Sequence, residues 1–267
     1  MSKIKVIILG SSGKMGQMLI QEIIDDKELV LAGAHDISGS YTIAKDAGYF
    51  IGKQTGVLIQ DNIDHLLSSS DVIIDFTRPE ATMEFLKKAS DQKVSYVIGT
   101  TGFNSSELDL IRGYSQYIPI CLAPNMSVGV NVLISLVEKA AVLLPEYDYE
   151  VIEAHHKDKV DAPSGTALRL GEAVADGLDI SMEKNAVYTR HGREEKRKKN
   201  EIGFSTIRAG DIVGEHKVII AGNGERIELT HKATSRLNFA SGALKAAKFV
   251  VNQKPKLFDM QQILDLK

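Results

Sequence analysis

Residues 6–16 read VIILGSSGKMG, four apolar residues followed by a turn that carries three glycines. Such an unbroken apolar run is typical of a strand buried on both faces of a parallel sheet. After the last glycine, apolar side chains recur at helical spacing, at Leu19, Ile20, Ile23 and Ile24. The stretch therefore predicts a buried strand, a tight turn and an amphipathic helix, the opening of a strand–helix–strand unit.

The same alternation continues over the first 120 or so residues. Strand-like apolar runs cover residues 29–34, 57–59, 72–76, 94–98 and 118–122. Helical patterns cover residues 79–89 and 105–114, and Pro79 suits the first position of a helix. Strands that alternate with helices predict an α/β fold, a Rossmann-like doubly wound parallel sheet.

The pattern changes after Pro124. A long apolar helix is expected over 128–144, followed by strand patterns near 151–154, 187–188, 202–207, 218–221 and 227–230 and a helix over 167–178. Asn223 and Gly224 favour a type I′ hairpin turn. Helical patterns return over 239–251 and 258–266. We therefore predict a dinucleotide-binding domain over 1–127 and 237–267, and a second α+β domain with a mixed sheet over 128–236.

Composition restricts the partners of the chain. Its 267 residues carry a formal net charge of −3, which gives no general attraction to nucleic acid or to an anionic membrane. No apolar run approaches the length of a membrane span. The single cysteine, Cys121, excludes an internal disulfide and lies in an apolar run. We expect a cytoplasmic protein whose partners are small molecules or copies of itself.

The glycine turn predicts a dinucleotide site. Gly10, Gly13 and Gly16 depart from the usual Gly-x-Gly-x-x-Gly, but they follow the first strand and open a helix. Glycines let the backbone approach a pyrophosphate, and the helix N-terminus supplies free N–H groups. Asp36 ends the next strand, twenty residues after Gly16, where an acid binds the adenosine ribose. The alternative is a turn that only lets the chain change direction.

Residues around Asp36 bear on the choice of cofactor. An acid at this position repels a 2′-phosphate, and Ile37 offers no cation in its place. Lys14 is near enough in sequence to help bind one. We therefore favour NADH and leave NADPH open. Two further loops, 76–79 and 99–103, follow strands and could reach the nicotinamide half, although ordinary turn chemistry explains each of them equally well.

A second motif, EAHHKDKVDAPSGTA, occupies residues 153–167. Ser164, Gly165 and Thr166 precede the predicted helix, so their N–H and hydroxyl groups converge on one place suited to a carboxylate. Lys159 and the histidines add positive charge and titratable protons. A proton donor beside an anion site fits the reduction of a C=C or C=N bond by a nicotinamide.

Other interpretations of this motif remain open. His155 and His156 are adjacent at a strand end, so they point to opposite faces and cannot easily share one metal ion. Ser164 lacks the spacing of a nucleophile elbow. A polar loop, a dinucleotide-sensing regulator, and a metal-dependent hydrolase with His155, His156 and Asp161 as ligands are the alternatives.

The chain also resembles a known family over nearly its whole length. The stretches GSSGKMG, DFTRPE, VIGTTGF, APNMSVGVN, EAHHKDKVDAPSGTA, RAGDIVGEH and ERIELTHKATSR carry the resemblance, to the dihydrodipicolinate reductases. It implies reduction of 4-hydroxy-tetrahydrodipicolinate to tetrahydrodipicolinate with NADH or NADPH and loss of water, in lysine and diaminopimelate biosynthesis. It also implies a homotetramer, with the second domain binding substrate and forming the tetramer. A reductase of another cyclic imine dicarboxylate is the nearest alternative.

The resemblance assigns roles by position. It implies His155 as the proton donor and Lys159 as a second catalytic group; we expect no metal ligand, because no cysteine or third histidine stands at ligand spacing. The substrate-binding residues would be His156, Ser164, Gly165 and Thr166. The cofactor contacts would be Gly10, Ser11, Ser12, Gly13, Lys14, Met15, Asp36, Gly99, Thr100, Thr101, Ala123, Pro124, Asn125 and Met126. Some relatives have an arginine after the acid, where this chain has Ile37, which counts against efficient use of NADPH.

Overall fold

A computed structural model describes residues 2–192 and 194–266. The chain divides into two compact units: the first runs to Val128 and resumes from Arg236 to Asp265, and the second comprises Gly129–Ser235 together with Leu266. Each unit has its own sheet and its own hydrophobic core. Among the described residues, no helix combines the length and hydrophobicity that crossing a bilayer requires.

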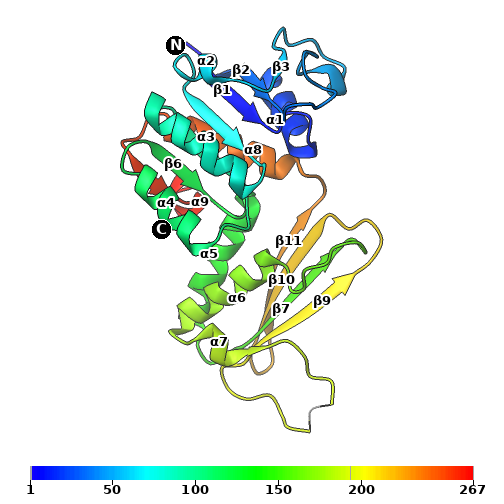
Figure 1. The fold of residues 1–267 in the computed structure, drawn as a ribbon. Helices are drawn as coiled ribbons and strands as arrows, with labels where there is room; N and C mark the ends of the chain where they lie inside the picture. Colours follow the sequence, from blue (N-terminus) through cyan, green and yellow to red (C-terminus); the bar gives the residue numbers. More distant parts are fainter. Residues whose placement is uncertain (1, 193, 267) are drawn as a thin grey trace. The chain divides into compact units, whose positions relative to one another are not determined.

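The first unit is built on a seven-stranded parallel sheet of order β12-β6-β5-β4-β1-β2-β3 (Figure 1). The strands are β1 (Ile4–Leu9), β2 (Leu29–His35), β3 (Ile59–Gln60), β4 (Val72–Asp75), β5 (Ser95–Ile98), β6 (Pro119–Leu122) and β12 (Lys256–Phe258). The predicted Rossmann-like, doubly wound parallel sheet is confirmed.

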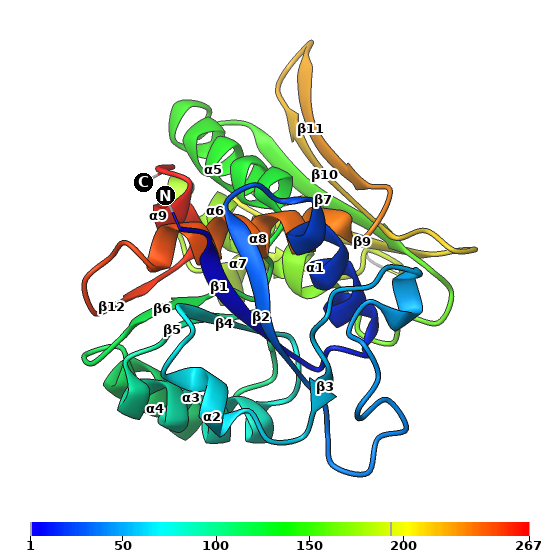
Figure 2. The same ribbon diagram turned by 90° about the horizontal axis from the view of Figure 1, so that it is seen from above.

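The helices of this unit cover both faces of its sheet (Figure 2). Because side chains alternate along a strand, Ile7 and Leu9 pack against α3 (Pro79–Gln92) and α4 (Ser105–Tyr114). Their neighbours Val6 and Ile8 pack on the opposite face, with the helices Lys14–Asp25 and Leu237–Val250. The remaining helices and their bounds are α1 (Lys14–Asp25), α2 (Asp64–Leu67), α8 (Leu237–Val250), α9 (Met260–Ile263) and the 3-10 turn η1 (Tyr49–Ile51).

The end of the chain differs from the prediction of a helix over 258–266. Residues Lys256–Phe258 form β12, which pairs with β6 at the edge of the sheet, and only the short α9 follows. Asp259 caps the N-terminus of α9, since its side chain accepts the N–H of Gln262. The apolar spacing fits either element, and the free edge of β6 selects a strand.

The second unit contains a mixed five-stranded sheet of order β11-β10-β7-β9-β8. Its strands are β7 (Asp148–His155), β8 (Ala186–Val187), β9 (Ile202–Arg208), β10 (Gly214–Ala221) and β11 (Arg226–Ala233). β10 is antiparallel to β7 and β11, whereas β7, β9 and β8 run parallel. The Asn223–Gly224 hairpin forms, but only Gly224 has a positive φ (+87°), so the predicted type I′ turn is wrong.

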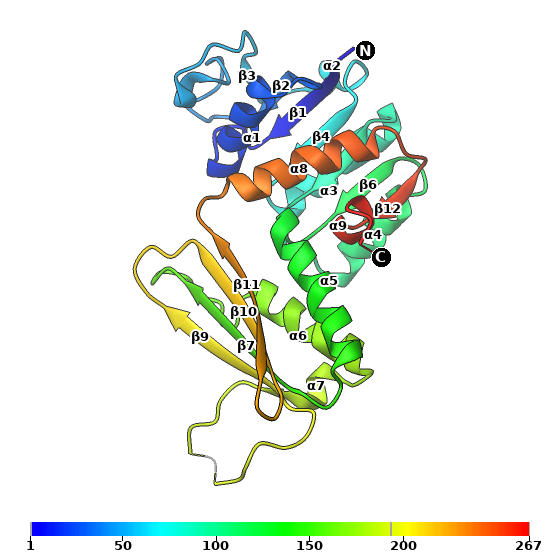
Figure 3. The same ribbon diagram turned by 180° about the vertical axis from the view of Figure 1, so that it is seen from behind.

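Helices cover one face of this second sheet (Figure 3). They are α5 (Val128–Leu143), α6 (Gly165–Leu178) and α7 (Met182–Asn185). Val151 and Val218 point toward the helices and meet Leu133, Leu170 and other apolar side chains in a single core. The alternate residues of each strand therefore face away from this core.

Candidate active site

The glycine turn of the first unit needs glycine for its backbone conformation and for its close packing. Gly10 has φ +66°, in the left-handed region. A Cβ on Gly16 would lie 2.2 Å from the carbonyl oxygen of Gly10, so the first turn of α1 packs directly on the loop. The N–H of Ser11 donates to the carbonyl of His35 at 2.9 Å, which joins the turn to the end of β2.

This turn fits the pyrophosphate of a dinucleotide. In the described part of the chain, no side chain caps the N-terminus of α1, where Gly13 precedes Lys14 and Met15. Ser11 is 1% exposed, and its buried hydroxyl has no hydrogen-bond partner among the described residues. Uncapped N–H groups and a buried, unpaired hydroxyl are what an anionic ligand would satisfy.

Asp36 lies beside the same turn. Its carboxylate accepts hydrogen bonds from the hydroxyls of Ser12 and Thr42, the latter at 3.1 Å. The backbone N–H of Ile37 also donates to it, at 2.9 Å. The Ile37 side chain is 74% exposed and presents no cation. The acid predicted to bind a ribose is therefore held next to the glycine turn.

The predicted cofactor residues of the first unit follow five neighbouring strands, in the order β6-β5-β4-β1-β2. Residues 10–15 follow β1 and Asp36 follows β2, while the loop beginning at Phe76 follows β4. Gly99, Thr100 and Thr101 follow β5, and Ala123, Pro124, Asn125 and Met126 follow β6. Because parallel strands end at one edge, these residues share the edge where ligands of such sheets bind, and β1 lies where the strand order reverses.

A buried carboxylate organises two of these loops. Asp75, at the end of β4, is fully buried. Its oxygens accept the N–H and hydroxyl of Thr77 at 2.8 and 2.6 Å, and the hydroxyl of Thr100 at 3.2 Å. Thr82 and Tyr96 donate to the other oxygen at 2.7 and 2.9 Å. We call Asp75 and these four donor residues the Asp75 cluster; it ties the loop after β4 to the loop after β5.

Close backbone contacts fix the neighbouring loops as well. A Cβ on Gly99 would lie 2.3 Å from the ring of Phe76. A Cβ on Gly242 would lie 1.7 Å from the carbonyl oxygen of Met126, so α8 supports the loop after β6. These loops are therefore held by packing that only glycine allows.

In the second unit, the helix N-terminus predicted to bind a carboxylate begins two residues earlier than expected. α6 starts at Gly165, and the hydroxyl of Ser164 accepts the N–H of Ala167 at 3.2 Å. Apart from its chain neighbours and the backbone of its own helix, a Cβ on Gly165 would meet no atom of the described residues within 4 Å, so space is open in front of this turn. Thr166 belongs to the first turn of the helix. The N–H groups there can hold an anion.

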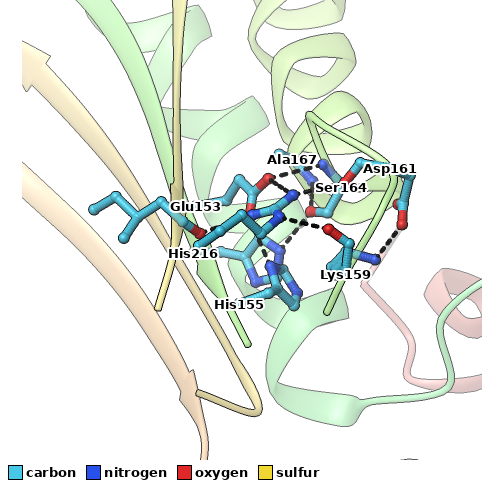
Figure 4. A network of polar contacts seen from close by, with 9 residues as sticks. Glu153, His155, Lys159, Asp161, Ser164, Ala167 and His216 are labelled. Carbon is cyan, nitrogen blue, oxygen red and sulfur yellow. Dashed lines mark hydrogen bonds and ion pairs between the residues drawn. The ribbon is translucent and has the colours of Figure 1, made fainter. Parts of the chain in front are cut away.

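A second buried carboxylate, Glu153 on β7, lies behind this helix N-terminus (Figure 4). Its side chain is 1% exposed and receives both guanidinium nitrogens of Arg208 at 2.8 Å. The N–H of Ser164 donates to it at 3.1 Å, and Nδ1 of His155 lies 2.6 Å away. We call Glu153, His155, Ser164 and Arg208 the Glu153 cluster.

Charges within the Glu153 cluster fix its protonation. Burial would raise the pKa of Glu153, but hydrogen bonds from Arg208 and His155 lower it to about 2. A carboxylate can only accept, so Nδ1 of His155 is the donor and Nε2 is left for a ligand. Burial lowers the pKa of His155, and Lys159 and Arg208 lower it further, while Glu153 raises it.

A further histidine supports Ser164 from the neighbouring strand. His216 on β10 is 4% exposed, and its Nε2 lies 3.0 Å from the Ser164 hydroxyl. Its ring centroid is 5.2 Å from that of His155. Burial lowers the pKa of His216 to about 4, and the neighbouring His155 contributes in the same direction. His216 is therefore neutral at physiological pH.

The loop between β7 and α6 carries the other predicted residues. Lys159 forms an ion pair with Asp161 at 2.7 Å and is mostly buried. Arg208 donates to the backbone carbonyls of Lys159 and Asp161 at 3.2 and 2.6 Å. The guanidinium that binds Glu153 therefore also anchors this loop. His156 directly follows β7 and its carbonyl accepts the N–H of Lys159. The structure thus gathers His155, Lys159, Ser164 and Gly165 in one region of the second unit.

Sequence reasoning missed Glu153, Arg208 and His216 as members of this site. Glu153 is two residues before His155, so the alternation of a strand places both on one face, which is a readable signal. Arg208 and His216 belong to strands whose pairing with β7 the sequence does not specify. Among the described residues, no group of three or more His, Cys, Asp or Glu is placed to hold a metal ion.

Comparisons with known proteins agree along the whole chain. Residues 4–126 match the family model described as dihydrodipicolinate reductase, N-terminus, and residues 129–264 match the corresponding C-terminus. The chain belongs to the dihydrodipicolinate reductase family. This is an oxidoreductase family with a dinucleotide-binding fold.

Relatives of this reductase family match end to end. The 4-hydroxy-tetrahydrodipicolinate reductase of Paraburkholderia phymatum is 50% identical over 98% of this chain and 100% of its own length. That of Nitrosomonas europaea is 49% identical over 100% of both chains. A solved dipicolinate-bound dihydrodipicolinate reductase from Paenisporosarcina sp. TG-14 has a TM-score of 0.79 and 24% identity, and covers 97% of this chain and 98% of its own.

Proposed function

We propose that this chain is a 4-hydroxy-tetrahydrodipicolinate reductase that uses a reduced nicotinamide dinucleotide. In the overall reaction the hydroxylated cyclic dicarboxylate, the reduced nicotinamide dinucleotide and one proton give tetrahydrodipicolinate, the oxidised nicotinamide dinucleotide and water. The observation that carries the proposal is the pairing of His155 with the open N-terminus of α6 in one region. A proton donor next to an anion site suits this substrate.

The residues of the second unit would divide the work on the substrate. N–H groups at Gly165 and Thr166 and the hydroxyl of Ser164 would bind a carboxylate, with His156 beside them. His155 would deliver a proton from Nε2, and Lys159 would exchange Asp161 for a substrate carboxylate or for developing negative charge. These contacts are all charge-assisted, so a neutral analogue of the substrate should bind weakly.

The first unit would hold the dinucleotide, which supplies the hydride when it is bound. The turn from Gly10 to Met15 would bind its pyrophosphate, and the loops 99–101 and 123–126 would approach the nicotinamide half. Asp36 would accept hydrogen bonds from the adenosine ribose. We propose a preference for NADH, because Asp36 repels a 2′-phosphate and the exposed Ile37 offers no cation.

We also propose a homotetramer assembled through the second unit. The face of its sheet away from α5 and α6 carries Ile152, Ile207 and Ile219, and Ile207 is 47% exposed. Lys217 and Glu228 form an ion pair of 2.8 Å on that face. Light scattering after size exclusion tests this: a tetramer mass is expected, and a monomer at micromolar concentration would contradict it. A cytoplasmic location also stays a prediction.

The proposed reaction is tested by loss of nicotinamide absorbance. Substrate is made fresh from pyruvate and aspartate semialdehyde by the condensing enzyme, and NADH and NADPH are compared in parallel. Omitting the aldehyde is the control. We expect oxidation of the nicotinamide that depends on the aldehyde and continues in the presence of a chelator. The KM for NADH should be lower than the KM for NADPH. Tight NADH binding without any substrate-dependent oxidation would contradict the proposal and favour a dinucleotide sensor. If NADH or NADPH were oxidised only with another cyclic imine dicarboxylate, the chain would be a reductase of that compound instead.

A further inference from the structure

The Glu153 cluster joins two functions that the proposed reaction needs. One oxygen of Glu153 accepts Nδ1–H of His155 at 2.6 Å, while the other accepts the N–H of Ser164 at 3.1 Å. The first bond orients the proposed acid and the second holds the proposed carboxylate-binding turn. A single buried side chain therefore sets the position of both groups (Figure 4).

Arg208 explains how this carboxylate stays charged inside the protein. A carboxylate that is 1% exposed is costly unless it is paired and hydrogen-bonded. The two terminal nitrogens of Arg208, Nη1 and Nη2, each donate to one carboxylate oxygen of Glu153 at 2.8 Å. Such a fork of two parallel bonds fixes direction as well as charge. Arg208 also donates to the carbonyls of Lys159 and Asp161, so the same residue anchors the loop that carries the lysine.

We infer that Glu153 is a positioning residue of the reductase: it holds the imidazole of His155 with Nε2 toward the substrate and stabilises its protonated form, and Arg208 keeps Glu153 ionised. This inference rests on the proposed function. It assigns to Glu153 no direct contact with the substrate. The bond to Nδ1 selects the tautomer in which the neutral ring has its lone pair on Nε2, and so the proton that leaves is the one on Nε2.

The other charged groups around His155 make Glu153 decisive for its titration. Lys159 from the following loop, Arg208 from β9 and His216 from β10 all face the ring. Each of these groups is cationic or neutral, and His231 lies beyond His216 on β11. Among the described residues, Glu153 is the acid in hydrogen-bond contact with His155. Removing its charge leaves His155 among cations, and its pKa must fall.

The test compares Glu153→Gln with the wild type and with Glu172→Gln. Glu172 is an exposed acid on α6 of the same unit, in an ion pair with Arg169, so it undergoes the same chemical change away from the site. We expect Glu153→Gln to lower kcat by about 10²-fold, with less than a threefold change in the KM for NADH. Since a general acid must be protonated, activity declines above its pKa. This decline should begin at lower pH in Glu153→Gln and stay in place in Glu172→Gln.

A spectroscopic readout separates this inference from the proposed reaction. The titration of His155 is followed by nitrogen-15 NMR of its ring in both proteins without any substrate. A lower pKa and a loss of the fixed tautomer in Glu153→Gln are expected even if another substrate is the true one. An unchanged titration would overturn the inference while leaving the reductase assignment intact. Absence of turnover in the wild type would instead overturn the assignment.

A second variant guards against misfolding. Glu153→Gln leaves Arg208 without its partner, so Glu153→Gln combined with Arg208→Met removes both charges. The double variant should fold, and the His155 pKa in it should lie below that of Arg208→Met alone, because Arg208 itself lowers this pKa and its removal offsets part of the effect of losing Glu153. Glu153→Asp keeps the charge but shortens the side chain, so its decline in activity with pH should stay near that of the wild type. A double variant with the same pH profile as Arg208→Met alone would show that Glu153 only supports the fold, and the inference would be wrong.

Discussion

Asp75 in the first unit and Glu153 in the second are carboxylates buried near the carboxyl end of a strand, but different donors surround them. Among the described residues, the donors to Asp75 are neutral: the hydroxyls of threonines and a tyrosine and one backbone N–H. The donors to Glu153 include the guanidinium of Arg208 and the imidazole of His155. Neutral hydroxyls can fix loops, whereas only the Glu153 cluster contains a group that exchanges a proton near neutral pH.

The largest expected effect comes from removing the titratable group of the Glu153 cluster. His155→Ala should lower kcat by about 10³-fold, because general acid catalysis is lost. Binding of NADH, measured by fluorescence titration, should be unchanged. His191→Ala, an exposed histidine in the same unit, is the control and should retain full turnover. Near-normal kcat in His155→Ala would break the assignment of proton transfer to this cluster.

The next effect is on stability and involves His216, which packs beside the same cluster. Its folded pKa of about 4 lies below the ordinary 6.5, so the unfolded chain binds more protons between these values. The stability that this residue contributes is complete above pH 6.5 and is lost as the pH falls toward 4. At pH 5 the loss relative to pH 7 should be about 2 kcal/mol.

Urea unfolding of wild type and His216→Gln at pH 7 and pH 5 measures this loss. The variant should lose less stability between the two pH values than the wild type. Equal losses in both proteins would show that His216 is not held neutral by burial.

A smaller effect is expected from the Asp75 cluster. Asp75→Asn replaces an acceptor by an amide that presents N–H groups to threonine hydroxyls, so the loops after β4 and β5 loosen. The KM for NADH should rise by about tenfold, measured by steady-state kinetics, because preorganised loops bind at lower cost. Asp91→Asn, an exposed acid on α3, should leave it unchanged. A rise confined to the KM for the dicarboxylate would contradict a role in cofactor binding.

The smallest effect concerns the part of the first unit that is proposed to bind the adenosine ribose of the cofactor. Ile37→Arg adds a cation at an exposed position next to Asp36. The KM for NADPH should fall by about fivefold while that for NADH changes little, since an exposed charge pair contributes only modestly. Parallel kinetics with both cofactors check this. An unchanged KM for NADPH would show that residue 37 does not face the 2′ position.

The sequence predicted what depends on local pattern. The spacing of the glycines was enough to predict the turn from Gly10 to Gly16. The alternation of strands with helices was enough to predict the parallel sheet around it. Ser164, placed before a helical pattern, was enough to predict where α6 begins to within two residues. Whether residues 256–258 pair with β6 was not readable, because a short apolar run fits a strand or a helix equally well.

The clusters needed long-range pairing. Glu153 and Arg208 are separated by 55 residues and meet because β7 and β9 pair in a register that places His155 opposite Arg208. Asp75 and Tyr96 meet through the pairing of β4 with β5. A shift of one residue in either pairing would send one partner to the other face of the sheet. No local pattern fixes such a register, so the sequence could identify His155 and Ser164 but not the residue that holds them.

The division between cofactor support and proton transfer is tested most directly by one kinetic comparison. The pH dependence of kcat/KM and the KM for NADH are measured for wild type, Asp75→Asn and Glu153→Gln. We expect Asp75→Asn to raise the KM for NADH without moving the pH at which activity declines. Glu153→Gln should move that pH downward without raising the KM for NADH. If each variant changed both quantities alike, the two carboxylates would not have separate functions and the account would be contradicted.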